Sequence, residues 1–418
     1  MTMEREEGAA RAALSVAGSG RSRRAFLTTA AAIGGPLLVS PKTAFGTQAN
    51  SRIRLGAIGC GGRGTWIAEL FQKHGGFEIR AAADYFQDRV DEFGGKLQVP
   101  AERRHAGLQG YGRLLESDLD AVAIESPPCF HPRHAADTVA AGKHVFLAKP
   151  VAVDVPGCRT VEESGRKATE KKRAFLVDFQ TRTDPYYREA VKRAQYGDIG
   201  RIICGEATYV CGPTWGDQAK WLTEKPGDPE LRLRAWGLDR ALSGDVITEQ
   251  NIHALDVAAW ILDAAPLHAV GTGGRRARTA GTCWDHFSVI FTFPQDVVVT
   301  FVSKQLGDGW DDICCRMYGT EGTLDSHYFG EVSIRGKVPY RGGKIPSLYQ
   351  DGAVANIAAF HDSITRGDFS NSTVAASVRS NLTTILGRTA AWRHGKVTWD
   401  EMMSASEALE PDLAGLRS

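Results

Sequence analysis

Apolar and polar positions follow a regular order of elements from residue 52 to residue 179. Short apolar stretches rich in β-branched residues predict buried strands, and the segments between them have the spacing of helices. The expected strands are 52–58, 77–83, 120–125, 144–147 and 174–179, and the expected helices start at 65 or cover 86–96, 131–141 and 156–170. Strands that alternate with helices in this way predict a parallel sheet with helices on both faces.

The pattern changes after residue 199. Strands become longer and alternate apolar with polar residues, as in Phe287–Phe293 and Val297–Lys304, which predicts an antiparallel sheet with one buried face. The stretch Gly212–Trp236 contains three tryptophans and is interpreted either as a long loop over a ligand crevice or as core packing. Residues 351–393 predict two helices.

A glycine-rich turn follows the first predicted strand. Residues 52–64 read RIRLGAIGCGGRG, with a G-x-G-x-x-G pattern between a strand and a helix. The first glycine of this pattern allows a tight turn, the second lets backbone N–H groups approach a pyrophosphate, and the third lets the helix pack on the strand. The pattern alone also fits a glycine-rich turn in another α/β domain. The residues expected to bind a dinucleotide here are Gly59, Gly61, Gly62, Arg63 and Gly64.

The second predicted strand ends in an acid that indicates which nucleotide is bound. Asp84 follows strand 77–83, close to the offset of ~20 residues expected for an acid that hydrogen-bonds an adenosine ribose. A carboxylate also repels a 2′-phosphate, so NAD is expected as the cofactor and NADP is less favoured. A neighbouring cation such as Arg63 would weaken that preference.

These patterns predict an α/β protein in four parts. An N-terminal Rossmann domain with a doubly wound parallel sheet is followed by a C-terminal α+β domain with a large open, mainly antiparallel sheet. The expected boundaries are 1–50 for a signal and linker, 51–180 for the Rossmann domain, 181–350 for the α+β domain, and 351–418 for a C-terminal helical segment that packs back on the core.

The first 50 residues have the order of an export signal. The stretch Ser22–Leu27 carries paired arginines followed by Phe-Leu, and a short apolar segment and small residues come after it. This order resembles a twin-arginine signal peptide. We therefore expect a periplasmic or otherwise exported protein, with the twin-arginine export machinery as a partner. Because that route carries folded proteins to a compartment without a free nicotinamide pool, we expect a tightly held nucleotide.

The composition argues against several classes of binding partner. The net charge is +1, with 50 Lys and Arg against 49 Asp and Glu, so nothing indicates binding to nucleic acid. No apolar stretch reaches the ~18 residues of a membrane span, so no stable membrane insertion is expected. The eight cysteines show no C-x-x-C pair and no Cys/His zinc spacing, so we interpret them as small core residues and expect no metal site. Adjacent Cys314 and Cys315 are expected on opposite faces of a strand.

Two further stretches contain candidate catalytic side chains, one at the end of a predicted buried strand and one on a predicted helix. Ala148-Lys149-Pro150 ends strand 144–147, which places Lys149 in the crevice where parallel strands end. Glu249 and His253 lie four positions apart, and this spacing puts them on one face of a helix.

Together with the two-domain pattern, these stretches resemble the glucose-fructose oxidoreductase, inositol dehydrogenase and MocA family, abbreviated Gfo/Idh/MocA. The resemblance covers residues 52–402. It includes the glycine turn, Asp84, the approach from Pro127 to His131, the run Ala141–Val145, and the tail near Val397–Glu401.

The resemblance implies an NAD(P)-dependent oxidoreductase acting on a secondary hydroxyl or ketone of a sugar, glycoside or cyclitol. Family members typically show Glu-Lys-Pro at 148–150 and Asp-x-Gly-x-His-x-x-Asp at 249–256. The lysine, the histidine and the first acid therefore carry over to Lys149, His253 and Glu249. The departures at Ala148, Glu249 and Asn251 leave the substrate and the reaction direction open.

The chemistry of these side chains suggests their roles. An imidazole is a natural base near neutral pH, and a neighbouring cation lowers the cost of alkoxide character on a substrate oxygen. We hypothesise that His253 takes the hydroxyl proton, that Lys149 holds and polarises the oxygen, and that Glu249 binds another hydroxyl or orients the site.

Other candidates surround this set. Ser126, Pro127, His131 and Lys149 are expected to contact the cofactor, with His131 shaping the nucleotide loop. Arg182 and Tyr186 are expected either to reach the substrate or to join the domains. Asp256 is expected to cap or pair within the structure.

Two other functions remain open. Some relatives of the family are redox-neutral glycosidases that oxidise a sugar transiently, eliminate the leaving group, add water and reduce again. A non-catalytic ligand-binding protein is the third reading, disfavoured because the lysine and histidine are both present. The open sheet with an apolar face leads us to expect a homodimer or homotetramer.

Overall fold

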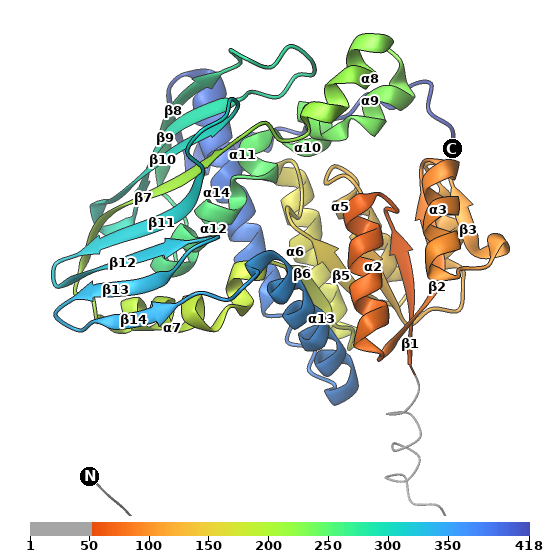
Figure 1. The fold of residues 1–418 in the computed structure, drawn as a ribbon, viewed down its shortest axis with the longest axis horizontal. Coiled ribbons are helices and arrows are strands. Elements are labelled where there is room, and N and C mark those ends of the chain that lie inside the picture. Colours follow the sequence, from red (N-terminus) through yellow and green to blue (C-terminus); the bar gives the residue numbers. More distant parts are fainter. Residues whose placement is uncertain (1–51) are drawn as a thin grey trace, which may run out of the picture. The chain divides into compact units, whose positions relative to one another are not determined.

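The computed structural model describes residues 52–418, so the predicted twin-arginine signal lies outside the described residues. Two sheets organise this part of the chain, one of six strands and one of nine (Figure 1). The predicted fold class is confirmed. The expected boundary at residue 180 falls between the last strand of the first sheet and the helices that lead to the second. None of the described helices is long and apolar enough to cross a membrane.

The six-stranded sheet is parallel throughout, in the order β3-β2-β1-β4-β5-β6. This is the strand order of a doubly wound Rossmann fold, in which ligands bind where the order reverses between β1 and β4. The prediction missed β3, a three-residue edge strand too short to show a pattern. The strands are β1 Ile53–Ile58, β2 Phe77–Asp84, β3 Arg104–Ala106, β4 Ala121–Ile124, β5 His144–Ala148 and β6 Phe175–Asp178.

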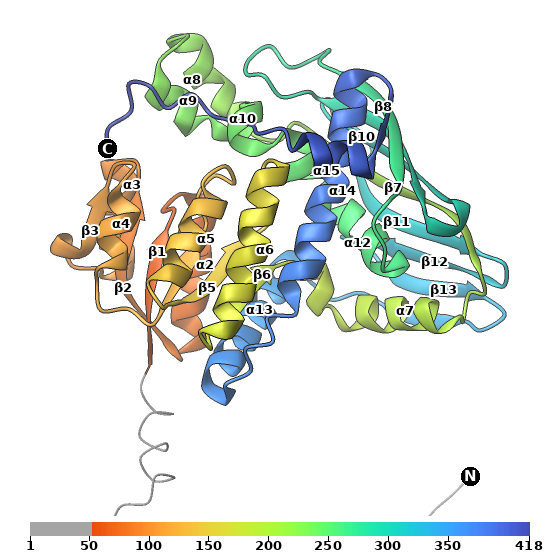
Figure 2. The same ribbon diagram turned by 180° about the vertical axis from the view of Figure 1, so that it is seen from behind.

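Each face of this sheet packs against its own layer of helices. Strand side chains alternate between two core clusters: Leu55 and Phe146 face one layer, and Val122 and Leu147 face the other. Figures 1 and 2 show these layers from opposite sides. One layer contains α2 Gly62–His74, α3 Gln87–Leu97 and α13 Leu348–Arg366, and the other contains α4 Gly110–Leu115, α5 His131–Ala140 and α6 Val155–Glu170.

The nine-stranded sheet has the order β14-β13-β12-β11-β7-β10-β9-β8-β15 and is antiparallel except for the β7·β10 pair. Its inner face carries Phe291, Phe301 and Met317 and packs on the helices. Its outer face is the opposite one, where Ile290 and Val302 are each 47% exposed. The strands are β7 Ile202–Cys211, β8 His268–Gly274, β9 His286–Phe293, β10 Val297–Gln305, β11 Asp312–Gly319, β12 Gly322–His327, β13 Val332–Gly336, β14 Tyr340–Gly343 and β15 Lys396–Thr398.

The remaining helices connect the two sheets. The two predicted C-terminal helices are confirmed as α13 and α14, and α13 packs on α2 whereas α14 packs on α6 and α12. The other helices are α7 Pro185–Tyr196, α10 Arg240–Ser243, α11 Val246–Glu249, α12 Ile252–Leu262, α14 Thr373–Arg393 and α15 Trp399–Ala405.

The segment Gly212–Trp236 is not a loop throughout. It contains the short helices α8 Ala219–Glu224 and α9 Pro229–Arg234, which begin after polar residues and place Trp215 against Trp236 with ring centres 5.5 Å apart. Beside this segment, the chain after α15 runs as a tail that ends next to α3 (Figure 2).

Candidate active site

The glycine turn is built as the sequence predicts. Gly59 has φ of +96°, and a Cβ there would lie 2.5 Å from the backbone of Glu125. A Cβ at Gly64 would lie 1.8 Å from the carbonyl oxygen of Gly59, so only glycine lets α2 pack this closely. By contrast, a Cβ at Gly62 would meet nothing within 4 Å.

That open space lies at the N-terminus of α2. Gly61 is the N-cap residue and provides no side-chain hydrogen bond, so the first N–H groups of the helix lack a capping partner. A pyrophosphate fits this position because it would accept those hydrogen bonds and face the positive end of the helix dipole. The residues present therefore fit a dinucleotide.

Asp84 is fixed beside the turn. Its carboxylate accepts hydrogen bonds from the backbone N–H of Cys60 at 2.8 Å and of Phe86 at 3.0 Å. Burial raises the pKa of Asp84. A pocket opens next to it, as expected for an adenosine subsite, and its lining includes Phe86, Arg89, Leu108, Pro127 and Phe130.

Arg63 does not face this pocket. Its guanidinium pairs with Glu125 at 3.0 Å and with Asp178, and it donates to the Tyr349 hydroxyl at 2.7 Å. The arginine that lines this pocket with Asp84 is Arg89, so Arg89 rather than Arg63 is placed to weaken the preference for NAD.

The ion pairs of Arg63 join three loops of the crevice. Glu125 follows β4 and Asp178 ends β6, and their side chains are almost fully buried. Burial raises the pKa of Glu125, and the positive charge of Arg63 lowers it. Burial has the larger effect, so the pKa is raised to about 7. Sequence reasoning missed this cluster, although an acid directly after the buried stretch Ala121–Ile124 signals that a partner must be nearby.

Lys149 reaches across the crevice to Glu249. Its Nζ donates to the Glu249 backbone oxygen at 2.7 Å and lies 3.1 Å from Glu249 Oε1, and both side chains are buried. Burial lowers the pKa of Lys149, while the Glu249 carboxylate opposes that effect. Glu249 also accepts a hydrogen bond from Gln250, which Tyr209 orients from β7. Both sheets thus contribute to the site.

The sequence predicts Glu249 and His253 on one helix, but in the structure they lie on two different helices. α11 ends at Glu249 and α12 begins at Ile252, and Asn251 lies fully buried at the junction. Asn251 is the departure from the family's glycine, and neither polar atom of its amide has a hydrogen-bond partner. The helix therefore breaks between the two predicted residues.

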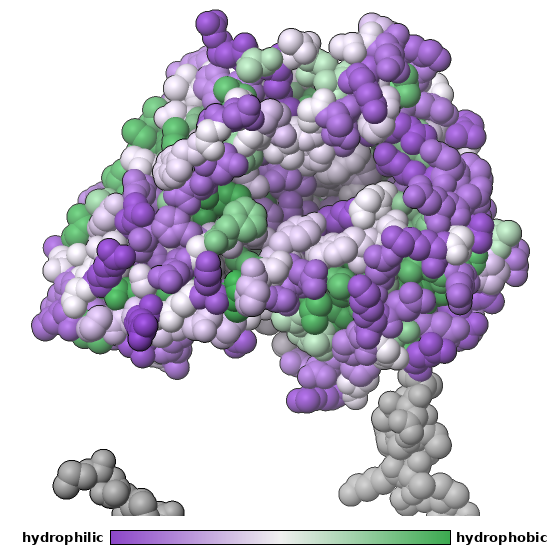
Figure 3. Space-filling model, in the orientation of Figure 1, coloured by the Kyte–Doolittle hydropathy of each residue, from purple (hydrophilic) through white to green (hydrophobic). Residues whose placement is uncertain are grey.

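His253 is buried with its Nδ1 unpartnered. Its ring lies 5.2 Å from that of Tyr328, whose hydroxyl is also buried without a partner. Burial lowers the pKa of His253 well below its usual value, and the positive charges of Lys149 and Arg63 lower it further. The imidazole is therefore neutral near pH 7 and able to accept a proton. In the orientation of Figure 1, Figure 3 shows the surface hollowed between α10 and the upper end of α2.

His131 links two loops at the cofactor side. Its Nδ1 lies 2.8 Å from the Pro150 oxygen and its Nε2 lies 2.7 Å from the Ser126 oxygen. Ser126 also contacts His134 through its hydroxyl at 3.0 Å. This geometry agrees with a shaping role for His131.

The remaining predicted residues have partners outside this set. Arg182 pairs with the fully buried Asp256 at 2.8 Å and stacks on Trp260, so the pair joins η2 (Gln180–Thr183) to α12. Tyr186 lies against Gly343 at the end of β14. Both contacts favour the structural alternative, and contact with substrate stays a prediction for these two residues.

The C-terminal tail reaches the adenosine subsite, which the sequence did not reveal. The Arg417 oxygen accepts from the Leu108 N–H at 3.0 Å, and the Arg417 N–H donates to the Tyr85 hydroxyl at 3.1 Å. The Tyr85 hydroxyl in turn donates to Glu230 of α9 at 2.8 Å. Leu416 packs in the same apolar cluster. The tail and α9 thus cover residues that line the adenosine subsite.

Comparison with known protein families agrees with this arrangement. Residues 53–179 match the model of an oxidoreductase family with an NAD-binding Rossmann fold, and residues 187–325 match the GFO/IDH/MocA C-terminal domain. The chain belongs to the Gfo/Idh/MocA oxidoreductase family. Residues 53–179 therefore form an NAD-binding Rossmann domain, and NAD is the cofactor.

Individual relatives divide between two activities. Inositol 2-dehydrogenase 3 of Saccharopolyspora erythraea is 27% identical over 280 residues, which is 65% of this chain and 72% of that protein. The alpha-N-acetylgalactosaminidase of Shewanella oneidensis is 31% identical over 183 residues, which is 42% of this chain and 38% of that protein. The chain thus aligns with well under half of the second relative.

Solved structures share the fold. The scyllo-inositol dehydrogenase of Lactobacillus casei with NAD(H) and scyllo-inositol has a TM-score of 0.65 at 19% identity, covering 84% of this chain and 99% of that one. A levoglucosan dehydrogenase in complex with NADH and levoglucosan has a TM-score of 0.67 at 16% identity, covering 83% and 99%.

Proposed function

We propose that this oxidoreductase oxidises or reduces a secondary CH–OH group of a sugar, glycoside or cyclitol. The observation that carries the proposal is the buried Lys149–Glu249 pair with the unpartnered, neutral His253 close by. The inositol dehydrogenase relatives support the substrate class.

The chain's own residues divide the work on the hydroxyl. The Lys149 ammonium can exchange its bond to the Glu249 backbone oxygen for one to the substrate oxygen and so stabilise alkoxide character there. The imidazole of His253 takes the hydroxyl proton. Burial, Lys149 and Arg63 all disfavour its charged form, and the negative charge that develops on the substrate oxygen offsets the repulsion from the two cations. Glu249 keeps Lys149 charged and offers its carboxylate to a second hydroxyl. NAD, when bound, accepts the hydride.

We infer that the cofactor stays bound through turnover. The hydrogen bonds of Arg417 to Leu108 and Tyr85 support this, because the tail must lift before residues beside the adenosine subsite are uncovered. Retention also fits the predicted export of a folded protein to the periplasm. A second carbonyl compound would then reoxidise the nucleotide in a closed cycle.

One alternative has a specific observation in its favour. The Shewanella relative named as an alpha-N-acetylgalactosaminidase matches the chain at 31% identity over 183 residues. The same site would then serve a redox-neutral glycosidase. A purely ligand-binding protein would not need the buried Lys149 and His253, so this function is disfavoured. For assembly, we propose that the part of the outer face formed by β9 and β10 joins the chains of a homodimer or homotetramer, because Ile290 and Val302 are half exposed there.

The experiment starts from the purified protein without added nucleotide. Denaturation should release NAD or NADH, identified and quantified by chromatography, in an amount close to one per chain. The intact protein is then assayed with sugar and cyclitol pairs, and separately with nitrophenyl glycosides without an acceptor. Oxidation coupled to reduction of a second carbonyl supports the dehydrogenase, and aglycone release supports the glycosidase. A protein that neither contains nor binds NAD would contradict both.

A further inference from the structure

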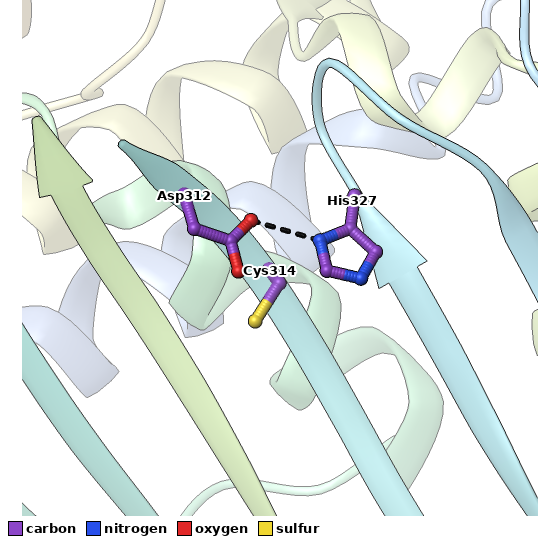
Figure 4. Close-up of side chains that lie close together, drawn as sticks. All are labelled: Asp312, Cys314 and His327. Atoms are coloured by element: carbon purple, nitrogen blue, oxygen red, sulfur yellow. Dashed lines mark hydrogen bonds and ion pairs between the residues drawn. The ribbon is translucent and has the colours of Figure 1, made fainter. Parts of the chain in front are cut away.

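Three potential metal ligands meet on the outer face of the nine-stranded sheet, opposite the inner face that packs on the helices. Asp312 and Cys314 lie on β11, and His327 ends the adjacent strand β12 (Figure 4). One atom from each side chain, an oxygen, a sulfur and a nitrogen, lies within 4.8 Å of the others. We propose that Asp312, Cys314 and His327 form a binding site for a divalent zinc ion.

Strand pairing fixes the position of these ligands. Cys314 lies directly opposite His327 in the antiparallel β11·β12 pair, and Asp312 is two residues before Cys314 on the same face. The next residue, Cys315, faces the core instead, as predicted for adjacent cysteines. Three ligands therefore converge from rigid strands rather than from mobile loops.

The donor set matches zinc. Zinc takes imidazole nitrogen, thiolate sulfur and carboxylate oxygen at about 2.0–2.3 Å in a tetrahedron, which requires ligand atoms about 3.3–3.8 Å apart. His327 Nδ1 and Asp312 Oδ1 are 2.8 Å apart, so a small side-chain rotation opens the required space. The side chains of Asp312 and His327 are partly exposed, which leaves a path for the ion and a fourth position for water.

Further contacts support the ligands from outside the proposed coordination sphere. His327 Nε2 lies 3.2 Å from Asp325 Oδ1, so a carboxylate can accept the second ring proton and leave Nδ1 free for the metal. The Thr208 hydroxyl on β7 lies 3.2 Å from the Cys314 sulfur and can donate to a thiolate. A cysteine binds zinc as the thiolate, so binding at Cys314 is expected to release the thiol proton.

The test uses the whole protein with Zn²⁺ and Co²⁺ as probes. Metal content after equilibration and gel filtration is expected to be one Zn²⁺ per chain. Co²⁺ should give a thiolate charge-transfer band and the visible bands of a tetrahedral ion. Isothermal titration in buffers of different ionisation enthalpy should show a proton released on binding.

Matched variants identify the ligands. Cys314→Ser should abolish the thiolate band, and His327→Gln should remove Zn²⁺ binding, whereas Cys204→Ser and His286→Gln, at half-buried positions in the same sheet, should change neither. Asp325→Asn should weaken Zn²⁺ about 10–100-fold and keep the thiolate band, as expected for a residue that positions His327. NAD binding and circular dichroism show that each variant is folded.

The proposal is overturned if the folded wild-type protein binds no Zn²⁺ above the level of the Cys314→Ser variant. It is also overturned if Co²⁺ binds without a thiolate band. Neither result tests NAD binding, because none of the three proposed zinc ligands lines the pocket beside Asp84.

Discussion

Charged groups gather in two regions, the crevice and the outer face of the nine-stranded sheet, and burial separates them. In the crevice, Arg63 pairs with Glu125 and Asp178, whose side chains are 2% and 0% exposed. On the outer face, Arg316 pairs with Glu206 and Asp325, whose side chains are 37% and 22% exposed. An arginine with two carboxylate partners therefore occurs once with buried carboxylates and once with carboxylates that are partly exposed to solvent.

The two regions differ in how much folding stability is lost when one member of an ion pair is removed. Glu125 and Asp178 are too buried for water to replace a lost arginine, so their remaining charge destabilises the fold even though Gln180 and Asn356 still donate hydrogen bonds to Asp178. Water replaces the lost partner on the outer face, so the pair there contributes little. Crevice charges are thus fixed in place, whereas outer-face charges can rearrange around an added ion.

The largest expected effect is on turnover. Lys149→Met and His253→Ala should each lower kcat/KM about 10²–10⁴-fold, because the first removes the cation at the substrate oxygen and the second removes the base. Steady-state rates with the best substrate measure this, and Lys337→Met on the exposed surface is the control. Activity within tenfold of wild type in both variants would refute these roles.

The two triads can be compared directly. Arg63→Met should lower the free energy of unfolding by about 3 kcal/mol, since it leaves two buried carboxylates facing each other. Arg316→Met should lower it by about 0–1 kcal/mol. Urea denaturation at pH 7 gives both values. Equal losses would mean that burial does not distinguish the two regions.

Buried histidines make the Rossmann half sensitive to acid. Burial lowers the pKa of His134 to about 3 and that of His144 to about 4, and His144 Nδ1 accepts a hydrogen bond from Ala174 N–H. The unfolded chain binds protons near pH 6.5 while the folded chain does not, so stability falls as the pH drops from 7 towards 4.

At pH 5 each of these histidines should cost about 2 kcal/mol of folding free energy. Urea denaturation at pH 7 and pH 5 of the wild type and of His144→Gln tests this, because the variant should lose less stability on acidification. An unchanged dependence in His144→Gln would contradict the prediction.

The smallest effect concerns the tail. Removing residues 409–418 should speed NAD release about tenfold, equivalent to about 1.4 kcal/mol. Tyr85→Phe should reproduce part of this effect, since it removes the hydroxyl that contacts Arg417 and Glu230. Stopped-flow displacement of NADH measures the rate. An unchanged rate in the truncated protein would show that the tail does not retain the cofactor.

Much of the fold of this protein could be predicted from its sequence alone. Local patterns determined the parallel strands and most of their helices, because buried apolar runs and a glycine turn are signals carried by consecutive residues. Through the resemblance to the family motif they also indicated Lys149, Glu249 and His253 as candidates, and the structure places Lys149 against Glu249.

Only the tertiary structure decided which distant groups meet. Arg63 reaches Glu125 and Asp178 from loops far apart in the chain, and the tail reaches Tyr85 across more than three hundred residues. The zinc ligands meet through the pairing of β11 with β12, which no Cys/His spacing reveals. Side chains that converge from different elements are governed by packing and by the free energy of burying charge, and neither is encoded in any single stretch of sequence.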